Sequence, residues 1–434
     1  MPQAVPHFSL DRLPPWITAQ NIAWFGTFAL VITLSWSEAI QNIASGFIVL
    51  GALWHLASTP RPQWIEDRSR WIHGLLISGI FGLSLLGGLY TETEGAWITD
   101  VRQKLPFLIL GLTLGVLPGF SYKQFYLIIV AFLLTQSIIA LLSIADFFQH
   151  FEMGMGRISR NANIPIAVKI SHIYFGLLLS GSVIFGLGIW LKKTYIRFSW
   201  ERHVVLGLTI FNFLALHLLS TRTGLLALYM GLGLGLMVYI IRSRAWKIGG
   251  TLFLLLLSLP LISYYTIPTF RTRIHATIWD IQGYKLSDRD LSHHSASLRL
   301  VAWEASLNIF IDSPVIGVGI GDLEQELATE FKRLNVRAAE EHLPKNPHNQ
   351  YFEYLVGFGL VGFSLLLTIC LFPWFAKKEK ISFLFISFVG IYIGAMFAES
   401  LLERQIGIYF FLIFIMLLPS YPPFALFPKA LSKQ

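Results

Sequence analysis

Apolar residues in this 434-residue chain fall into long stretches separated by short polar segments. An α-helix needs roughly 20 mostly apolar residues to cross a bilayer, and most of the stretches approach that length. Twelve stretches are predicted as spans, at residues 21–36, 37–57, 71–90, 105–119, 121–147, 168–191, 203–219, 224–241, 248–267, 350–376, 381–398 and 405–419. The first lacks a basic n-region and a small-residue cleavage site, so we interpret it as a helix rather than a signal peptide. The pattern predicts an all-α polytopic membrane protein.

One segment breaks this rhythm, because residues 268–349 have the composition of a soluble protein. The chain is therefore predicted to contain nine spans in 1–267, a loop domain in 268–349, and three spans with a tail in 350–434. Within the loop, apolar residues at helical spacing predict a helix over 297–311 that ends before Pro314. A second, charge-rich helix is predicted from about 322 to 342.

Composition supports this class. Hydrophobic residues make up 54% of the chain and charged residues only 13%, whereas soluble domains carry about a quarter charged residues. This excludes a soluble enzyme, and twelve stretches exclude a receptor with one span. The single cysteine, Cys370, excludes an intrachain disulfide. The net charge of +8 could suggest nucleic acid, but in a polytopic protein its distribution among the loops is the informative quantity, and we expect no nucleic-acid partner.

If the chain crosses the membrane twelve times, every charged residue outside the spans lies on one of the two sides of the membrane. The side that holds both termini carries 17 Lys and Arg residues against five acids, and the other side carries 16 against 20. Cytoplasmic loops are enriched in Lys and Arg, so both termini and the clusters at 192–193 and 377–380 are predicted to be cytoplasmic. The 268–349 loop is then predicted to face outward.

Two arginines near this outer boundary are candidate ligands of an anion. Arg222 lies in a very short turn, 220–224, between two predicted spans. Arginine costs about 2.5 to 3.5 kcal/mol at a helix centre and less at the interface. A fixed anion would offset that cost, and the alternative is a side chain that reaches lipid headgroups. Arg299 begins the first loop helix, with Trp303 one turn later, and its planar fork suits phosphate oxygens. The alternative for Arg299 is a surface salt bridge to Glu304 or another acid of the loop.

His348 is the candidate base, in the segment where the chain returns to the membrane. Pro347 suits a first helical position and Asn346 an N-cap, which places His348 in the first turn of the tenth span. There the helix dipole disfavours imidazolium and favours a neutral ring; the alternative is an interfacial cap. Two arginines and one neutral histidine at one membrane face are what transfer from a lipid-linked diphosphate needs, with no metal and no other cofactor.

Other groups were weighed against simpler interpretations. Arg157 and Arg160 either contact lipid phosphate or are solvated, and His172 and His217 lie in apolar stretches where structural contacts are the simpler interpretation. A divalent metal site is the alternative use of Asp288, Asp290, His275, His293 and His294. The spacing of Gly317, Gly319 and Gly321 does not fit a dinucleotide site. We interpret these glycines as a turn that serves packing or substrate access.

Three of these motifs resemble the O-antigen ligase and polymerase superfamily. The run from Arg299 to Gly319 has an Arg-x-x-x-Trp start and closes with Pro314, Gly317 and Gly319. His348-Asn349 is followed after nine residues by Gly359-Leu360-Val361-Gly362, which is similar to the histidine element of the ligases. Arg222 and Leu226 fit their Arg-x-x-x-Leu element. The twelve-span plan, with one large outer loop before span ten, resembles the ligases over nearly the whole chain.

The resemblance implies a multi-pass glycosyltransferase of the bacterial inner membrane, with its active site on the periplasmic face. It would transfer O-antigen polysaccharide en bloc from undecaprenyl diphosphate to a sugar hydroxyl of lipid A-core, inverting the anomeric centre without metal. By motif match, His348 would be the base, and Arg222 and Arg299 would bind the diphosphate. Polymerases of the superfamily tend to have two sizeable periplasmic loops, and the short segment at 148–167 favours a ligase. An O-antigen polymerase, a protein O-oligosaccharyltransferase and a lipid-glycan transporter remain alternatives.

Overall fold

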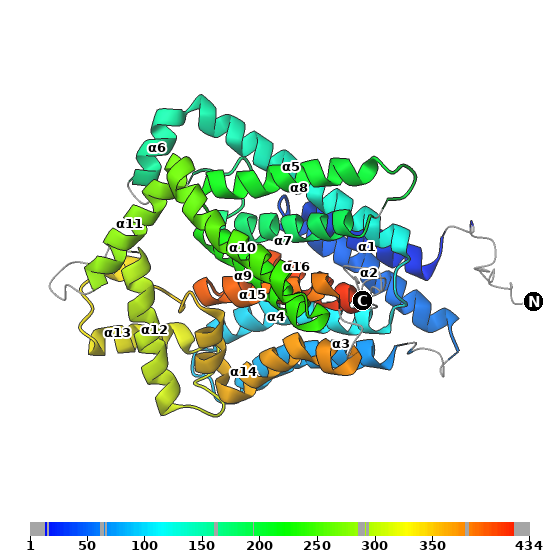
Figure 1. The fold of residues 1–434 in the computed structure, drawn as a ribbon. Helices are drawn as coiled ribbons and strands as arrows, with labels where there is room; N and C mark the ends of the chain where they lie inside the picture. The colour runs from blue at the N-terminus through cyan, green and yellow to red at the C-terminus, as the bar shows by residue number, and fades with distance from the viewer. Residues whose placement is uncertain are drawn as a thin grey trace, which may run out of the picture.

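The computed structural model describes residues 17–60, 67–159, 164–193, 195–284, 295–377 and 382–420, with the single positions 14, 65 and 291. All regular structure in these residues is helical (Figure 1). Twelve α-helices correspond to the twelve predicted spans: α1 (Ala19–Thr33), α2 (Glu38–Ser58), α3 (Arg68–Gly87), α4 (Glu94–Val116), α5 (Tyr122–Gln149), α7 (His172–Leu191), α8 (Glu201–Leu219), α9 (Arg222–Ser243), α10 (Trp246–Thr266), α14 (Gln350–Lys377), α15 (Phe383–Ala398) and α16 (Gln405–Leu417). Eight of them are long and apolar enough to cross a membrane, and α1, α15 and α16 are shorter apolar helices. The predicted all-α polytopic membrane class is confirmed.

Helix α4 begins well before the predicted apolar stretch at 105–119. Its first turns include charged residues, and contacts inside the protein compensate their charge. Lys104 is fully buried. Its Nζ lies 2.5 Å from Glu403 Oε1 and donates a 2.8 Å hydrogen bond to the Leu402 carbonyl. A buried ammonium is tolerated when it is paired and hydrogen-bonded, so the helix continues through charges that the hydropathy pattern assigned to a loop.

The centre of the bundle is packed with phenylalanine from α5, α7, α15 and α16. The rings of Phe185 and Phe414 have centroids 4.5 Å apart, and those of Phe388 and Phe410 are 5.5 Å apart. Phe132 stacks on Phe410 at 5.6 Å. Offset and edge-to-face pairs add about 0.5 to 1.5 kcal/mol each to the packing. These contacts hold α15 and α16 against α7, and they fix the segment that joins α15 to α16.

The loop region folds as three helices that gather at one end of the bundle, on the left in Figure 1: α11 (Pro268–Tyr284), α12 (Ser295–Asp312) and α13 (Leu323–Arg333). The short α6 (Phe151–Ser159) contacts α11. Helix α12 confirms the helix predicted over 297–311. The predicted second helix was too long, because α13 ends at Arg333 and Asn335 adopts a left-handed φ of 51°. A 3₁₀ turn follows at Glu340–His342.

The glycines of the two motifs pack against each other where the loop meets α14. Gly359 interrupts α14 with φ 62° and ψ −157°, a conformation that essentially only glycine adopts. A Cβ on Gly359 would lie 2.3 Å from the Val315 carbonyl oxygen, and one on Gly317 would lie 2.3 Å from that of Val356. Three main-chain hydrogen bonds join the segments: Val318 N to Val356 O, Leu360 N to Pro314 O and Val361 N to Val315 O, at 2.8, 2.9 and 3.2 Å. The packing role predicted for the glycine turn is confirmed, and this junction fixes α12 relative to α14.

Candidate active site

Two of the predicted site residues share one carboxylate. Glu399 lies between α15 and α16, and its side chain is only 8% exposed. Its Oε1 is 2.7 Å from His348 Nδ1, and its Oε2 is 3.2 Å from Arg299 Nη2. Arg299 and His348 are far apart in the loop sequence, and both contact Glu399 in the structure.

The charge of Glu399 determines which nitrogen of His348 carries a hydrogen. Burial alone would raise the pKa of the Glu399 carboxyl, but the hydrogen bond from His348 and the charges of His348 and Arg299 hold that pKa below its ordinary value. The group is therefore ionised at neutral pH and can only accept hydrogen bonds. His348 Nδ1 must donate in this contact, which leaves Nε2 with a lone pair that can accept a proton.

The predicted position of His348 in a helical turn is wrong. Helix α14 begins at Gln350, and His348 precedes it with a left-handed φ of 49°. Asn349 is the residue that caps the helix, because its Oδ1 accepts from the backbone of Tyr351 and Phe352 at 2.9 and 3.3 Å. Asn346 Oδ1 instead accepts from the His348 backbone at 3.0 Å. The ring is therefore oriented by Glu399 rather than by the helix dipole.

Neighbouring contacts hold this turn against α12 and α15. Trp303 Nε1 donates a 3.0 Å hydrogen bond to the Pro347 carbonyl, and its ring packs edge-to-face on Phe397 at 5.0 Å. Asn349 Nδ2 donates to the Phe397 carbonyl at 3.1 Å. Arg299 and Trp303 are four residues apart and so lie on the same side of α12. The Arg-x-x-x-Trp element therefore binds both Glu399 and the turn that carries His348.

Arg222 lies close enough to Arg299 to interact with it electrostatically, and also with Asp280 of α11. It is the first residue of α9, directly after a sharp turn in which Ser220 has φ 49°. The Thr269 hydroxyl at the start of α11 donates to the Leu218 carbonyl at 2.7 Å, which attaches this turn to the loop domain. The structure thus brings Arg222, Arg299 and His348 into one region, although they come from three separate elements.

Sequence reasoning missed Arg273, a third guanidinium in the same region and the most buried of the three. Arg273 of α11 is only 3% exposed. Burial and the nearby charge of Arg222 lower the pKa of Arg273 to about 10, so it still carries its charge at neutral pH. His172, at the start of α7, interacts electrostatically with all three arginines and with Glu399. We call Arg222, Arg273 and Arg299 the guanidinium cluster.

Three guanidinium charges lie close together in the guanidinium cluster, and the carboxylates of Asp280 and Glu399 interact with it electrostatically. Asp280 also accepts hydrogen bonds from the Ala296 backbone at 2.8 Å and from Ser295. A concentrated positive charge of this kind, partly desolvated, is suited to bind an anion with several oxygens. Arg299 and His348 remain partly exposed, with 24% and 34% of their side-chain surface accessible.

The remaining candidates lie elsewhere or outside the described part of the chain. Arg157 is exposed at the end of α6, and His217 is hydrogen-bonded to Tyr229 OH at 2.7 Å in a structural contact. His275 contacts Tyr264 OH at 2.9 Å. The positions outside the described residues are Arg160, Asp288, Arg289, Asp290, His293 and His294. The alternative weighed for Arg299 was a salt bridge within the loop, and the acid that Arg299 pairs with is Glu399, between α15 and α16.

Comparison with protein families gives one match. Residues 207–367 match the family model described as O-antigen ligase. No curated protein matches the chain. The matched region contains Arg222, Arg273, Arg299 and His348, whereas Glu399 lies beyond it. The match confirms the resemblance to the O-antigen ligase and polymerase superfamily and supports a function of that type in a membrane.

Proposed function

We propose that the protein is a glycosyltransferase that transfers O-antigen polysaccharide en bloc from undecaprenyl diphosphate to a sugar hydroxyl of lipid A-core. The observation that carries the proposal is the chain of contacts from Arg299 through Glu399 to His348, beside Arg222. These contacts support His348 Nε2 as a base beside the guanidinium cluster. Acid–base transfer from a diphosphate donor requires both groups within one site.

In the proposed reaction, His348 Nε2 takes the proton of the acceptor hydroxyl as its oxygen attacks the anomeric carbon of the donor sugar. A new carbon–oxygen bond forms, and the bond from that carbon to the diphosphate oxygen breaks. The lipid diphosphate leaves with the electron pair, and the arginines stabilise its added negative charge. Direct attack from the opposite face would invert the anomeric centre. The positive charge of the arginines replaces the role that a divalent cation has in other transferases, so no metal is needed.

Glu399 would act as a positioning residue. Its carboxylate fixes the Nδ1–H tautomer of His348 and stabilises the imidazolium that forms after proton transfer, as the acid does in other histidine-based sites. Arg273 would join Arg222 and Arg299 in binding the diphosphate oxygens. Arg157 and Arg160 would contact lipid phosphate.

The distribution of charge supports an orientation for the site. The predicted cytoplasmic side carries a strong excess of Lys and Arg, and the loop helices belong to the opposite side. We infer that α11, α12 and α13 face the periplasm, that the protein lies in the inner membrane, and that both termini are cytoplasmic. The diphosphate donor would then present its glycan in the same compartment as the acceptor.

A ligase is favoured over a polymerase because the segment between α5 and α7 is short, and its described residues form the nine-residue α6. A polymerase would use a carrier-linked glycan as acceptor, and a protein O-oligosaccharyltransferase would use serine or threonine. A transporter, the alternative from another class, would need ionisable groups along a path through the membrane centre. The helices α5, α7, α15 and α16 instead pack together through phenylalanine rings.

Reconstitution with separate acceptors tests the proposal. Purified protein in liposomes is given a lipid-diphosphate-linked glycan with lipid A-core, with a second carrier-linked glycan, or with a serine and threonine peptide, and products are identified by mass. We expect transfer to lipid A-core, retained in excess chelator. His348→Ala should lose about 10²- to 10⁴-fold in rate. His342→Ala, an exposed histidine of the same loop, is the matched control. Wild-type rates for His348→Ala would contradict the proposal, and a product only on another acceptor would exclude the ligase.

A further inference from the structure

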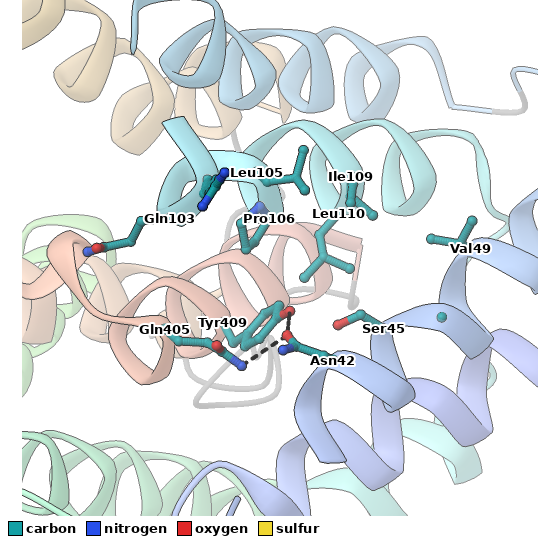
Figure 2. A pocket seen from close by; sticks show the side chains of 12 residues that line it. Asn42, Ser45, Val49, Gln103, Leu105, Pro106, Ile109, Leu110, Gln405 and Tyr409 are labelled. Carbon is teal, nitrogen blue, oxygen red and sulfur yellow. Dashed lines mark hydrogen bonds between the residues drawn. The ribbon is translucent and has the colours of Figure 1, made fainter. Parts of the chain in front are cut away.

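A cavity of about 420 Å³ lies between α2, α4 and α16. Figure 2 shows α4 above it, α16 to its left and α2 to its right. Its lining includes the exposed side chains of Arg102 and Leu105, so it reaches the surface of the bundle. None of the residues assigned to glycosyl transfer above lines it.

The lining of the cavity is amphiphilic. Asn42 Oδ1 accepts from Gln405 Nε2 at 3.1 Å and from Tyr409 OH at 3.0 Å, which forms a polar wall between α2 and α16 (Figure 2). Arg102 adds a positive charge. The rest of the lining includes aliphatic side chains, among them Leu105 and three others on α2 and α4: Val49, Ile109 and Leu110. A cavity with apolar walls and a few polar groups fits a lipid chain with an attached polar or anionic group.

The cavity adjoins the segment that carries Glu399. Gln405 lines the cavity and is six residues after Glu399, so the two are at most about 20 Å apart along the chain. Gln103, which also lines the cavity, donates a hydrogen bond to the Glu403 carbonyl in the same segment. A ligand here would therefore be anchored beside the candidate active site without occupying it.

We propose that this cavity binds the lipid portion of the acceptor glycolipid, an inference that rests on the proposed function. The polyprenyl chain of the donor matches this lining poorly, because that chain is wholly apolar and the donor's diphosphate would lie at the guanidinium cluster, which leaves the polar wall and Arg102 without a ligand group. An acceptor differs, because its reacting hydroxyl is separated from its lipid by several sugars. Its acyl chain would lie on the aliphatic wall, its anionic group near Arg102, and its sugars would extend past Gln405 toward His348.

Gly46 offers a way to fill the cavity without disturbing the backbone. It lines the cavity, and a Cβ placed on it meets no atom within 4 Å. Gly46→Phe would place a ring in the space proposed for the acyl chain. Gly82 of α3 is a matched control, because its Cβ also meets nothing within 4 Å, it is similarly half-buried, and it lies outside the cavity. Gly46→Leu is a smaller replacement should Gly46→Phe fail to fold.

The experiment measures transfer kinetics in liposomes with donor and acceptor varied separately, and binding of labelled acceptor glycolipid without donor. Gly46→Phe should raise the KM for acceptor about tenfold or more, since loss of about two buried methylene groups changes affinity about tenfold. The KM for donor and the kcat at saturating acceptor should be unchanged, and Gly82→Phe should match the wild type. Labelled acceptor should bind the wild type and Gly82→Phe more tightly than Gly46→Phe.

Several outcomes would overturn the assignment of the cavity. These are an unchanged acceptor KM in Gly46→Phe and Gly46→Leu, an equal effect in Gly82→Phe, or an effect on the KM for donor alone. Displacement of the labelled acceptor by bulk phospholipid at equal concentration would also overturn it, since the cavity would then bind any membrane lipid. A wild type that transfers to no acceptor would instead refute the proposed function, so the two failures are distinguishable.

Discussion

Two charge clusters contact the segment 399–405, one through Glu399 and the other through Glu403. The two clusters are opposite in character. The guanidinium cluster is rich in cations, and its members Arg222 and Arg299 are partly exposed. The second, which we call the lysine cluster, consists of Lys104, Asp100, Glu353 and Glu403. In it, Lys104 Nζ lies 2.5 Å from Glu403 Oε1 and 3.8 Å from Asp100 Oδ1.

The difference between the clusters separates a site for ligands from a structural network. In the lysine cluster the acids outnumber the cation, and neighbouring groups complete it: Ser400 Oγ donates to Glu353 at 2.8 Å and Gln350 Nε2 to Glu403 at 3.1 Å. Lys104 is thus already paired within its own cluster. In the guanidinium cluster three cations lie close together, which suits an incoming anion with several oxygens. The two clusters therefore lead to different expectations for their variants.

Loss of a guanidinium is expected to have the largest effect on activity. Arg222→Ala, Arg273→Ala and Arg299→Ala should each lower the rate of glycan transfer about 10²- to 10³-fold, the range for loss of one donor to a developing negative charge. Lys replacements should restore only part of the activity, because the planar fork is lost. Transfer to lipid A-core in liposomes measures this.

The matched control for the arginine variants is Arg333→Ala, which removes an exposed guanidinium of α13 that pairs with Glu330. It should transfer at the wild-type rate. If the three cluster variants transfer as well as Arg333→Ala, the guanidinium cluster does not bind the diphosphate, and the contrast with the lysine cluster loses its functional meaning.

Removal of the Glu399 charge should have an intermediate effect. Glu399→Gln is expected to lower kcat about 10- to 100-fold, the usual range for a group that orients another, with little change in the KM for donor. Without the carboxylate the Nδ1–H tautomer of His348 is no longer fixed, so the loss should appear in kcat. Glu304→Gln, on the exposed side of α12, is the control. A kcat of Glu399→Gln equal to that of Glu304→Gln would show that Glu399 does not position His348.

The lysine cluster should show the smallest effect on activity and a large one on stability. Lys104→Met leaves the acids of its cluster without their cation, which should cost about 3 to 5 kcal/mol in the free energy of unfolding. Transfer measured well below the unfolding temperature should fall less than about tenfold, because Lys104 does not contact the guanidinium cluster. Thermal unfolding in detergent measures the loss.

Lys345→Met is the control for Lys104→Met, since Lys345 pairs with Glu324 at 2.9 Å on the surface and is 80% exposed. It should leave the unfolding temperature unchanged. A Lys104→Met protein with wild-type stability and no transfer would reverse the comparison, and would place the lysine cluster within the catalytic machinery.

Much of the fold was predictable because hydrocarbon imposes a simple requirement on sequence. Each of the twelve apolar stretches became one helix, and α12 was predicted from its spacing. The start of α4 was missed because the partner that compensates Lys104 is 299 residues later in the chain, where no hydropathy window can detect it. The end of α13 was missed because charges alone do not show where Asn335 turns.

The candidate site was only partly predictable, for a related reason. Arg222, Arg299 and His348 were noticeable because cations and a histidine next to a proline are unusual at a membrane boundary. Glu399 was not, because an acid after an apolar stretch is ordinary on an outward side. Its importance depends on contacts with residues 51 and 100 positions away. Arg273 was missed because α11 has the polar composition of a surface helix, although the fold buries that side chain.

The junction between the loop and α14 has a consequence for exchanging specificity between related enzymes. Main-chain groups of residues 314–318 and 356–361 form this junction. Gly317 and Gly359 each leave room for the backbone of the facing segment. Side chains on the loop surface can therefore change without disturbing how the loop is mounted. A chimaera that takes its outer domain from another enzyme should transplant both halves of this junction together, because cutting the chain between them would separate backbone groups that fit only each other.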